Sequence, residues 1–495
     1  MAELLLGIDL GTTSTKAVLV DPVLGVLAEQ SRPVALHSDR VGHAEADPAV
    51  WWRNVGELVP ALLADARVPA DAVAAVATSG MVPAVLALDR RGRPLRRAIL
   101  QNDARAGAEI ADLAAKLGDL DVAARTGSAL TQQSVAPTLA WLSRHEPDTY
   151  AATVTVAGSY DWLARALGAR QHVERNWAME SGLYELDGRP FTPMFEAGGV
   201  DERLVPEVVD PGQPIGEVSA EAAGHTGLVA GTPILVGGAD HVLSAFAAGL
   251  RQPGDWLIKL GGGGDILAVT GSAFVDRRLY LDAHPAPGLW LPNGCMSTSG
   301  SLVRWLAALT GEQDLVSLGE RAATRRPGEV LCLPYFLGEK SPLHDPDLRG
   351  AFVGLDLAHD RADLFRAVLE AVAFGFRHHV DIFTERGVPL SGAPRVTNGG
   401  AGSPIWKQIH ADVLGRPVVP VLRHPGAALG AALAAGVGIG LLADWHARTD
   451  YLQLGEPVLP DPDRVARYDD VYRTWRRLGE ALAPFSHTLA NRSRT

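Results

Sequence analysis

Short apolar runs followed by glycine-rich turns recur along the chain and predict strands of a mixed α/β fold. Residues 4–8 predict a buried strand, and residues 16–20 predict its hairpin partner. Residues 26–28 predict a third strand, which would complete a meander at a sheet edge. Near the middle of the chain, residues 233–238 form another apolar run of strand length that ends in two glycines. These strands therefore predict that the chain from the first of them to the last forms one half of the protein, built around a sheet.

A carboxylate, Asp240, follows the central run and precedes a helix-like apolar segment at residues 242–249. Open α/β sheets bind ligands outside the carboxyl ends of their strands, and this position favours Asp240 as a catalytic base. Aspartate is also a common N-cap, so helix capping is the alternative interpretation. The pattern alone leaves both open.

The opening pattern recurs directly after Asp240. Residues 256–260 predict a strand, residues 261–264 a glycine turn, and residues 266–270 a partner strand. Two such units, one opening each half, predict a duplicated architecture with a hinge and with a nucleotide held between the halves. Runs of glycine also occur in flexible or tight loops that bind nothing.

Helical signals fill much of the remaining chain. Asp47 and Pro48 open a helix that extends to about residue 64, and helical periodicity dominates residues 106–167. Asp360 begins a long helix over residues 361–386, with apolar residues every four positions on one face. Two further segments complete the prediction: a Pro- and Gly-rich loop at residues 188–216 and a buried helix pair at residues 427–443.

Composition narrows the class of protein. At 495 residues the chain predicts two domains, or three, and 47% hydrophobic with 21% charged residues is typical of a globular protein. The formal charge of −12 argues against a nucleic-acid partner. Cys295 and Cys332 are too few for a disulfide framework, which favours a reducing compartment. With neither a signal peptide nor a membrane span evident, we expect a cytoplasmic protein.

The turn after the first strand has the chemistry of a phosphate site. Gly11 allows backbone N–H groups to face an anion, and the hydroxyls of Thr12, Thr13 and Ser14 can add donors. Asp9, at the end of the strand, could hold a magnesium ion over the phosphates. An ordinary hairpin with a polar turn is the alternative.

Glycines also precede a predicted helix late in the chain. Residues 396–403 pass from a strand into a helix that Ser403 and Pro404 begin. The N–H groups and the positive dipole end of such a helix favour phosphate or nucleotide. Alone this motif is weak, but it is the third glycine turn of its kind.

Two loops at strand ends are candidates for substrate contacts, because ligand-binding residues collect there. Ordinary turn preferences could also explain their composition. The candidates are Met81, Val82, Gln101, Asn102 and Asp103.

Taken together, these segments resemble the FGGY carbohydrate kinases of the actin–hexokinase superfamily, and most nearly their xylulokinase-like pentulose kinases. Residues 7–16 look like the family's first phosphate loop, and residues 238–240 match the segment that carries its catalytic aspartate. Residues 350–370 satisfy the family's second signature. Residues 337–342 and 398–403 resemble its adenosine-side segments.

The resemblance implies an α/β protein with a duplicated two-domain actin-like ATPase (ribonuclease H-like) fold and an interdomain cleft. Residues 1–243 would be the sugar-binding domain and residues 244–495 the ATP-binding domain. The implied reaction moves the γ-phosphoryl group of ATP to a primary hydroxyl of a small ketose, such as the pentulose D-xylulose, with Mg²⁺ as cofactor. The implied partners are a small-molecule sugar or polyol, neither nucleic acid nor membrane, and a second copy in a homodimer.

Residue roles also follow from the resemblance. Asp240 would be the catalytic base, and Asp9 and Asp240 would hold the metal. Substrate contacts would come from Met81, Val82, Gln101, Asn102, Asp103, Asp240 and His241, and cofactor contacts from Gly11, Thr12, Thr13, Lys16, Gly261, Gly262, Gly263, Ser301, Gly338, Gly400, Ala401 and Ser403.

Several positions depart from the family pattern. Thr138 stands where the first signature has a lysine, and Gly262 and Gly263 offer no hydroxyls in the second phosphate loop. Near the sugar, Val82 replaces a histidine and Gln101 replaces a tryptophan, and His241 replaces an asparagine after the catalytic Asp. These replacements predict a sugar pocket of altered shape. The sequence therefore leaves the identity of the acceptor undetermined among pentuloses such as xylulose and ribulose, erythrulose and glycerol. A non-sugar actin- or chaperone-like ATPase, or a family member that binds sugar without phosphorylating it, are the alternatives.

Overall fold

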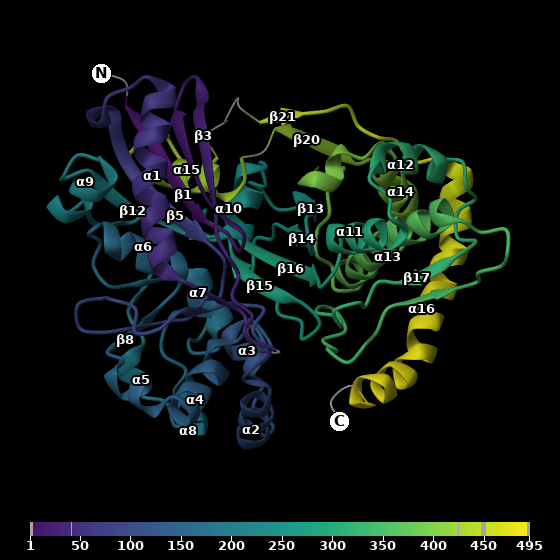
Figure 1. The fold of residues 1–495 in the computed structure, drawn as a ribbon, viewed down its shortest axis with the longest axis horizontal. Helices are drawn as coiled ribbons and strands as arrows, with labels where there is room; N and C mark the ends of the chain where they lie inside the picture. The colour runs from purple at the N-terminus through teal and green to yellow at the C-terminus, as the bar shows by residue number, and fades with distance from the viewer. Residues whose placement is uncertain (1–2, 41, 424, 447–451, 493–495) are drawn as a thin grey trace. The chain divides into compact units, whose positions relative to one another are not determined.

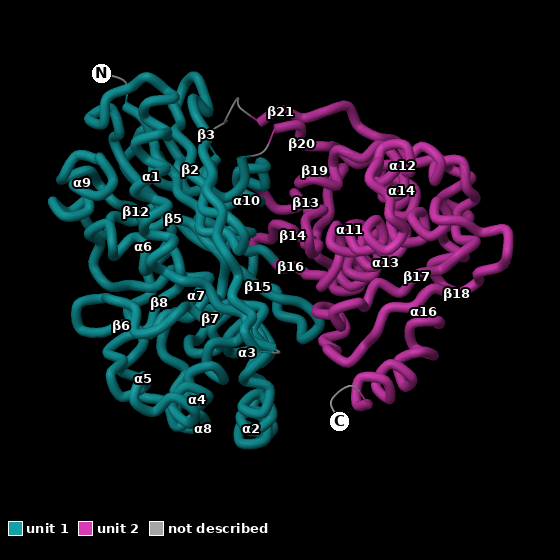
Figure 2. Tube along the Cα trace, in the orientation of Figure 1, with its two compact units in different colours: residues 1–251, 272–291, 425–451 teal, residues 252–271, 292–424, 452–495 magenta. Residues whose placement is uncertain are grey.

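The structure, a computed structural model, describes residues 3–40, 42–423, 425–446 and 452–492. The chain forms two compact units, which Figure 2 distinguishes by colour. Unit 1 contains residues 1–251, 272–291 and 425–451, and unit 2 contains residues 252–271, 292–424 and 452–495. The division expected after residue 243 falls inside a helix, α10 (Asp240–Ala247), whereas the chain leaves unit 1 after residue 251 and returns to it twice.

The sheet of unit 1 has six strands in the order β11-β12-β5-β1-β2-β3. Figure 1 labels four of them, β1, β3, β5 and β12. The meander predicted at the N-terminus is confirmed: β1, β2 and β3 pair antiparallel, while β5 pairs parallel with β1 and β12 pairs parallel with β5. The strands are β1 (Leu4–Leu10), β2 (Ser14–Asp21), β3 (Gly25–Pro33), β5 (Val73–Gly80), β11 (Pro214–Glu217) and β12 (Pro233–Ala239).

Unit 2 repeats this pairing pattern. Its sheet runs β16-β14-β13-β19-β20-β21, in which β16, β14 and β13 pair antiparallel. Strand β19 is parallel to β13, and β20 is parallel to β19. The predicted duplication is therefore confirmed by the strand pairing. The strands are β13 (Trp256–Leu260), β14 (Gly264–Ala268), β16 (Trp290–Met296), β19 (Arg395–Thr397), β20 (Val419–Arg423) and β21 (Gln453–Leu454).

Helices surround both sheets. Unit 1 contains α1 (Pro48–Ala66), α2 (Gly107–Leu117), α3 (Val122–Thr126), α4 (Val135–His145), α5 (Pro147–Ala152), α6 (Ser159–Leu167), α7 (Arg175–Ser181), α8 (Thr192–Gly198), α9 (Ala220–Thr226), α10 and α15 (Ala427–Gly438). Unit 2 contains α11 (Gly300–Thr310), α12 (Leu315–Ala323), α13 (Arg361–Glu385), α14 (Pro404–Leu414) and α16 (Pro462–Arg492). The short strands are β4 (Glu45–Ala46), β6 (Leu86–Leu88), β7 (Ala98–Ile99), β8 (Thr155–Ala157), β9 (Val173–Glu174), β10 (Val208–Val209), β15 (Tyr280–Ala283), β17 (Leu331–Leu333) and β18 (Ala351–Val353), and single 3₁₀ turns occur at Ala70–Ala72, Glu202–Leu204 and Gly399–Gly402.

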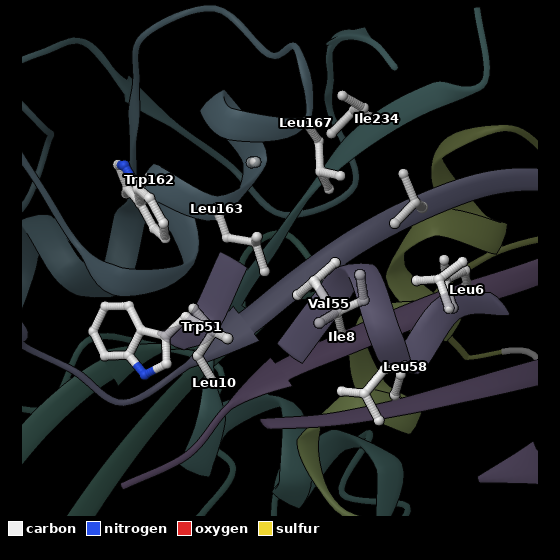
Figure 3. Close-up of a cluster of buried hydrophobic side chains, with 14 of the residues drawn as sticks. Leu6, Ile8, Leu10, Trp51, Val55, Leu58, Trp162, Leu163, Leu167 and Ile234 are labelled. Carbon is white, nitrogen blue, oxygen red and sulfur yellow. The ribbon is translucent and has the colours of Figure 1, made fainter. Parts of the chain in front are cut away.

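Alternation along β1 places two layers of helices on the sheet of unit 1. Leu6, Ile8 and Leu10 pack into the cluster that contains side chains of α1 and α6 (Figure 3). Leu5 faces the other way, against α10 and α15. Gly7 shares that second face, where a Cβ atom would lie 1.9 Å from the carbonyl oxygen of Ala428 in α15, so only glycine allows this helix to approach.

Most predicted helices are confirmed, and their caps explain where they begin. Asp47 accepts a hydrogen bond from Ala49 N–H at the start of α1, and Asp360 forms a capping box at the start of α13. The long helix predicted over residues 361–386 is confirmed as α13, and unit 2 packs around it so that most of its circumference is buried, not only the predicted apolar face.

Two other segments differ from prediction. Residues 188–216, predicted as loop, contain α8, a 3₁₀ turn and two short strands, since tertiary contacts order them despite their proline and glycine content. Residues 427–443 contain one helix, α15, rather than a pair, because the chain turns after Gly438 and residues 439–443 are not helical. None of the described helices combines the length and the hydrophobicity needed to cross a membrane.

Candidate active site

The candidate carboxylates lie at the carboxyl ends of the parallel strands in the sheet of unit 1. Strands β1, β5 and β12 run parallel, and both Asp9 and Gly238 are paired with Ser79 of the strand between them. Asp240 follows Gly238 by two residues and is the first residue of α10. Asp9 and the end of β12 are therefore two strand spacings apart, roughly 10 Å.

The structure separates the two interpretations of Asp240. The N-cap of α10 is Ala239, and no side chain caps the helix there. The carboxylate of Asp240 is about one-third exposed, with its Oδ1 atom 3.6 Å from Nδ1 of His241. Helix capping therefore does not explain this residue, and its carboxylate is accessible at the strand end.

His241 lies among three carboxylates of unit 1. Its Nε2 atom is 2.7 Å from Oδ2 of Asp282 and 3.8 Å from Oε1 of Glu180. Burial alone lowers the pKa of His241, but the charge of Asp282 and the proximity of Asp240 raise it well above the ordinary value. The ring is thus held between Asp282 on one side and Asp240 on the other.

A second layer of buried polar groups supports this arrangement. Asn176, in α7, donates from Nδ2 to the carbonyl of Ala283 (3.1 Å) and accepts from Ala283 N–H at Oδ1 (2.7 Å). Glu174 accepts hydrogen bonds from Asn176 and from the hydroxyl of Tyr160. Burial raises the pKa of the Glu174 carboxyl to about 7. These residues carried no signal in the sequence, because their partners are distant along the chain.

The other predicted substrate residues differ in exposure. Met81 and Val82 are buried, with the Met81 N–H bonded to the Leu10 carbonyl at the end of β1. Gln101 is half-buried, and its Oε1 atom is shielded from solvent and accepts no hydrogen bond from the described residues. Asn102 is exposed. A hydrogen bond therefore connects the loop that contains Met81 to β1, the strand that carries Asp9.

Asp103 has an internal role. Its Oδ2 atom accepts a hydrogen bond from Ala44 N–H at 2.6 Å, and both oxygens bind the guanidinium of Arg105 at 2.7–2.8 Å. Arg105 also contacts Glu45 at 2.7 Å. This network anchors the loop, so Asp103 shapes the neighbourhood of Gln101 by fixing the backbone. Thr138, at the departure in the first signature, is buried within α4.

The predicted phosphate turn of unit 1 joins β1 to β2. Gly11 N–H donates to the carbonyl of Ser14 at 3.0 Å, which closes the turn and leaves Thr13 exposed and Thr12 half-buried. Lys16 is the cross-strand partner of Asp9. Directly opposite residues of antiparallel strands project to the same face, so Lys16 lies beside the carboxylate.

Unit 2 contains a separate cavity of about 810 Å³. Its lining includes four residues predicted to contact the cofactor, namely Gly261, Gly262, Gly400 and Ser403. Trp406, Phe365 and Leu369 provide apolar walls. A cavity of this size with apolar walls and a glycine-rich floor suits a nucleotide base and its phosphates.

Glycine is sterically required at Gly400, which lines this cavity, and at Gly263, in the turn that contributes Gly261 and Gly262 to it. A Cβ atom on Gly400 would lie 2.5 Å from the Leu260 side chain and 2.6 Å from Trp406, and one on Gly263 would lie 2.9 Å from the Met296 carbonyl. The carbonyl of Gly261 accepts a hydrogen bond at 2.7 Å from the N–H of residue 300, at the start of α11. Close backbone packing therefore fixes the loop.

Besides Gly263, three residues of unit 2 that were predicted to contact the cofactor do not line the cavity. Ser301 lies in the first turn of α11, where its hydroxyl is buried without a hydrogen bond among the described residues. Ala401 is buried in the 3₁₀ turn. Gly338 packs against Pro346, and its neighbour Glu339 accepts hydrogen bonds from Ser297 N–H (2.7 Å) and Lys340 N–H (2.9 Å). Gly263 also lies outside the lining.

Sequence reasoning missed Arg304, which lies in α11 and lines the same cavity. One of its guanidinium nitrogens is 3.5 Å from where a Cβ atom of Gly262 would be. The side chain is exposed and makes neither a hydrogen bond nor an ion pair within the described part of the chain. The sequence did offer one signal for Arg304, namely its position one turn into a helix that begins at a glycine.

Comparison with known proteins agrees with this geometry. The N-terminal domain of the FGGY family of carbohydrate kinases matches residues 4–247, and its C-terminal domain matches residues 267–439. A xylulose kinase of Lactococcus lactis is 27% identical over 98% of both chains, and the Escherichia coli xylulose kinase is 28% identical over 97% of this chain and 99% of its own. The crystal structure of a xylulose kinase from Rhodospirillum rubrum is 42% identical and covers 98% of this chain and 100% of that one, with a TM-score of 0.90.

An autoinducer-2 kinase of Yersinia enterocolitica is 31% identical over 89% of this chain and 87% of its own. The family matches span both units, and the strand pairing of each unit is that of a sugar kinase with the actin-like ATPase fold. ATP is the phosphoryl donor and a small sugar the acceptor in this class of enzyme. The protein is thus a sugar kinase that belongs to the FGGY family of carbohydrate kinases.

Proposed function

We propose that this kinase transfers the γ-phosphoryl group of ATP to a primary hydroxyl of a pentulose such as D-xylulose. The observation that carries the proposal is the accessible carboxylate of Asp240 at the end of β12, beside His241. The acceptor class follows from relatives named xylulose kinase, which match almost the whole chain.

Asp240 would act as the general base. Its carboxylate would orient the acceptor hydroxyl and take its proton as the new O–P bond forms. Because the transition state of phosphoryl transfer is loose, the protein acts mainly by positioning and charge neutralisation. General-base assistance contributes about 10²–10⁴-fold to the rate.

Asp9 and Asp240 fit a magnesium site. Both offer carboxylate oxygens, the ligands that Mg²⁺ prefers, and they lie at the same sheet edge. Their separation of two strand spacings suits a metal that keeps some of its water ligands. When bound, the metal would neutralise phosphate charge, and Lys16 beside Asp9 would limit repulsion between the carboxylates and the incoming nucleotide.

The cavity of unit 2 would hold ATP. Gly261 and Gly262 carry no side chains to obstruct the phosphates, and Ser403 begins α14, whose N-terminal N–H groups favour negative charge. The loop lacks the hydroxyls typical of the family at Gly262 and Gly263. Arg304 would offset this loss, because a guanidinium at the same loop provides charged donors for phosphate oxygens.

On the acceptor side, Met81, Val82, Gln101 and Asn102 would line the sugar pocket. Val82 and Gln101 alter its polarity relative to the family pattern, so we expect other ketoses besides the pentulose in the acceptor range. The two free thiols fit a reducing compartment, and the cytoplasm stays a prediction. The homodimer is also a prediction, which light scattering on the purified protein tests.

The test is a coupled ADP-release screen over ketopentoses, ketotetroses, ketohexoses, glycerol and other polyols. D-xylulose or another ketopentose should give the highest kcat/KM, and the Asp240→Asn variant should lose turnover while it still binds the sugar. ATP hydrolysis that no sugar stimulates would contradict the proposal. Near-normal turnover by the Asp240→Asn variant would overturn the assignment of the base.

A further inference from the structure

The ring of His241 is fixed from the side opposite Asp240. Asp282 is fully buried, and its Oδ2 atom is 2.7 Å from Nε2 of the ring. Nδ1 is the ring nitrogen that faces Asp240, at 3.6 Å from its Oδ1 atom. With Nε2 engaged by Asp282, the ring can contact a ligand beside Asp240 only through Nδ1 or through its carbon atoms.

Asp282 is itself held by a buried clamp. Asn176 binds both backbone groups of Ala283, the next residue, and Asn176 is bound in turn by Glu174. The helix that carries Asn176 also carries Glu180, one turn further on, which approaches the same ring nitrogen. Two segments distant along the chain therefore meet at Nε2 of His241, where they fix the orientation of the ring.

We propose that Asp282 is a positioning residue of the acceptor site, which orients His241 so that Nδ1 and the Asp240 carboxylate together bind the vicinal diol at the phosphorylated end of the sugar. The inference rests on the proposed function. Asp240 receives the hydroxyl that is phosphorylated, and Nδ1 receives the hydroxyl on the neighbouring carbon. Because a hydroxyl both donates and accepts hydrogen bonds, the contact requires no particular protonation state of the ring.

The site therefore selects acceptors that carry a hydroxyl next to the phosphorylated carbon. A protein group positioned for a substrate hydroxyl disfavours the analogue that lacks it, because a desolvated polar group is then left unpaired. Acceptors with a terminal vicinal diol should react, and deoxy analogues should react poorly.

The experiment is a double-mutant cycle on kcat/KM for the best ketose of the acceptor screen. Asp282→Ala should lower kcat/KM by about 10–100-fold, because this is the effect of losing one hydrogen bond to a charged group. The KM for ATP should be unchanged. Asp282→Asn, whose amide oxygen still accepts from Nε2–H, should restore part of the loss. In a His241→Ala background, Asp282→Ala should have no further effect, because it acts through the ring.

A matched control is Asp187→Ala in the same unit, an exposed carboxylate paired with Arg189, which should behave like the wild type. The ketose that lacks the hydroxyl next to the phosphorylated carbon gives a second readout. Wild type should discriminate against it at least tenfold, whereas His241→Ala and Asp282→Ala should lose most of that discrimination. Additive effects in the cycle, or discrimination retained in both variants, would overturn the inference.

A readout independent of turnover separates this inference from the proposed function. Wild-type enzyme that releases no ADP with any ketose would refute the function alone. Positioning is then judged by calorimetric binding of the ketose and by long-range ¹H–¹⁵N correlations of the histidine rings. Weaker binding with altered His241 signals in both Asp282 variants supports the inference, and unchanged binding or unchanged signals contradict it.

Discussion

The two units share a strand pattern but differ in the chemistry at the ends of those strands. In unit 1, side chains dominate: Asp240, His241 and Asp282 form a contiguous polar group at the sheet edge. In unit 2, the cavity is bounded by glycine backbone and apolar walls, with Gly400 pressed against Trp406. The same scaffold therefore presents ionisable side chains in one copy, where we propose proton transfer, and a large glycine-bounded cavity in the other, where we propose nucleotide binding.

This difference indicates which kind of substitution each unit tolerates least. At the edge of unit 1, removal of one charge leaves the shape intact but alters the chemistry. In the cavity of unit 2, addition of one methyl group leaves the charge intact but alters the shape. Substitutions of opposite kinds in the two units test this contrast.

The largest expected effect comes from Asp240→Asn, which keeps the shape of the side chain and removes the base. We expect kcat to fall by about 10²–10⁴-fold, with the calorimetric affinity for the ketose within a few-fold of the wild type. Asp187→Asn, at an exposed ion pair of unit 1, is the control. A loss confined to sugar binding would assign Asp240 to recognition instead.

A buried carboxylate of unit 2, Glu339, should make stability depend on pH. Burial raises its pKa to about 7, although hydrogen bonds from Ser297 N–H and Lys340 N–H act to lower it. The native state then binds more protons than the unfolded state between about pH 4.5 and 7, so the free energy of unfolding falls as pH rises through this range. Urea unfolding at pH 5 and pH 8 should show this loss, roughly 2–3 kcal/mol for this group.

Glu339→Gln should flatten that slope, because the amide does not ionise and its oxygen can still accept both hydrogen bonds. Glu329→Gln, at a more exposed carboxylate of the same unit, should leave the slope unchanged. An identical pH slope in Glu339→Gln and the wild type would show that other groups cause it.

Gly400→Ala tests the shape of the cavity. The added methyl group would overlap Leu260 and Trp406, at a cost of about 1–3 kcal/mol, so the KM for ATP should rise about tenfold or more. Gly402→Ala is the matched control, because a Cβ atom there has no neighbour within 4 Å although the residue lines the same cavity. Equal effects of the two variants would contradict a steric requirement at Gly400.

The smallest effect is expected at Arg304. Arg304→Ala should raise the KM for ATP about five- to tenfold with kcat for the ketose little changed, since it removes one charged contact to phosphate. The difference should shrink at high salt, because the guanidinium is exposed. Arg326→Ala, an exposed arginine of the same unit, is the control. An unchanged KM would remove Arg304 from the nucleotide site.

Local patterns accounted for much of the fold. Short apolar runs predicted β1 and β2, and capping residues predicted the starts of α1 and α13. These signals succeed because each depends on neighbours within a few residues. The order around residues 188–216 escaped prediction, because contacts with the rest of unit 1 override its local preferences.

The sequence by itself determined the duplicated strand pattern, the glycine turns and the position of Asp240 after a strand, since periodicity and turn chemistry are written locally. Only the tertiary structure decided that Asp282 meets His241, that Asn176 binds the backbone of Ala283, that Asp103 accepts a hydrogen bond from Ala44 N–H, and that Arg304 lines the cavity. These contacts join residues far apart along the chain. Their partners are chosen by packing in three dimensions, which leaves no periodic trace in the order of the amino acids.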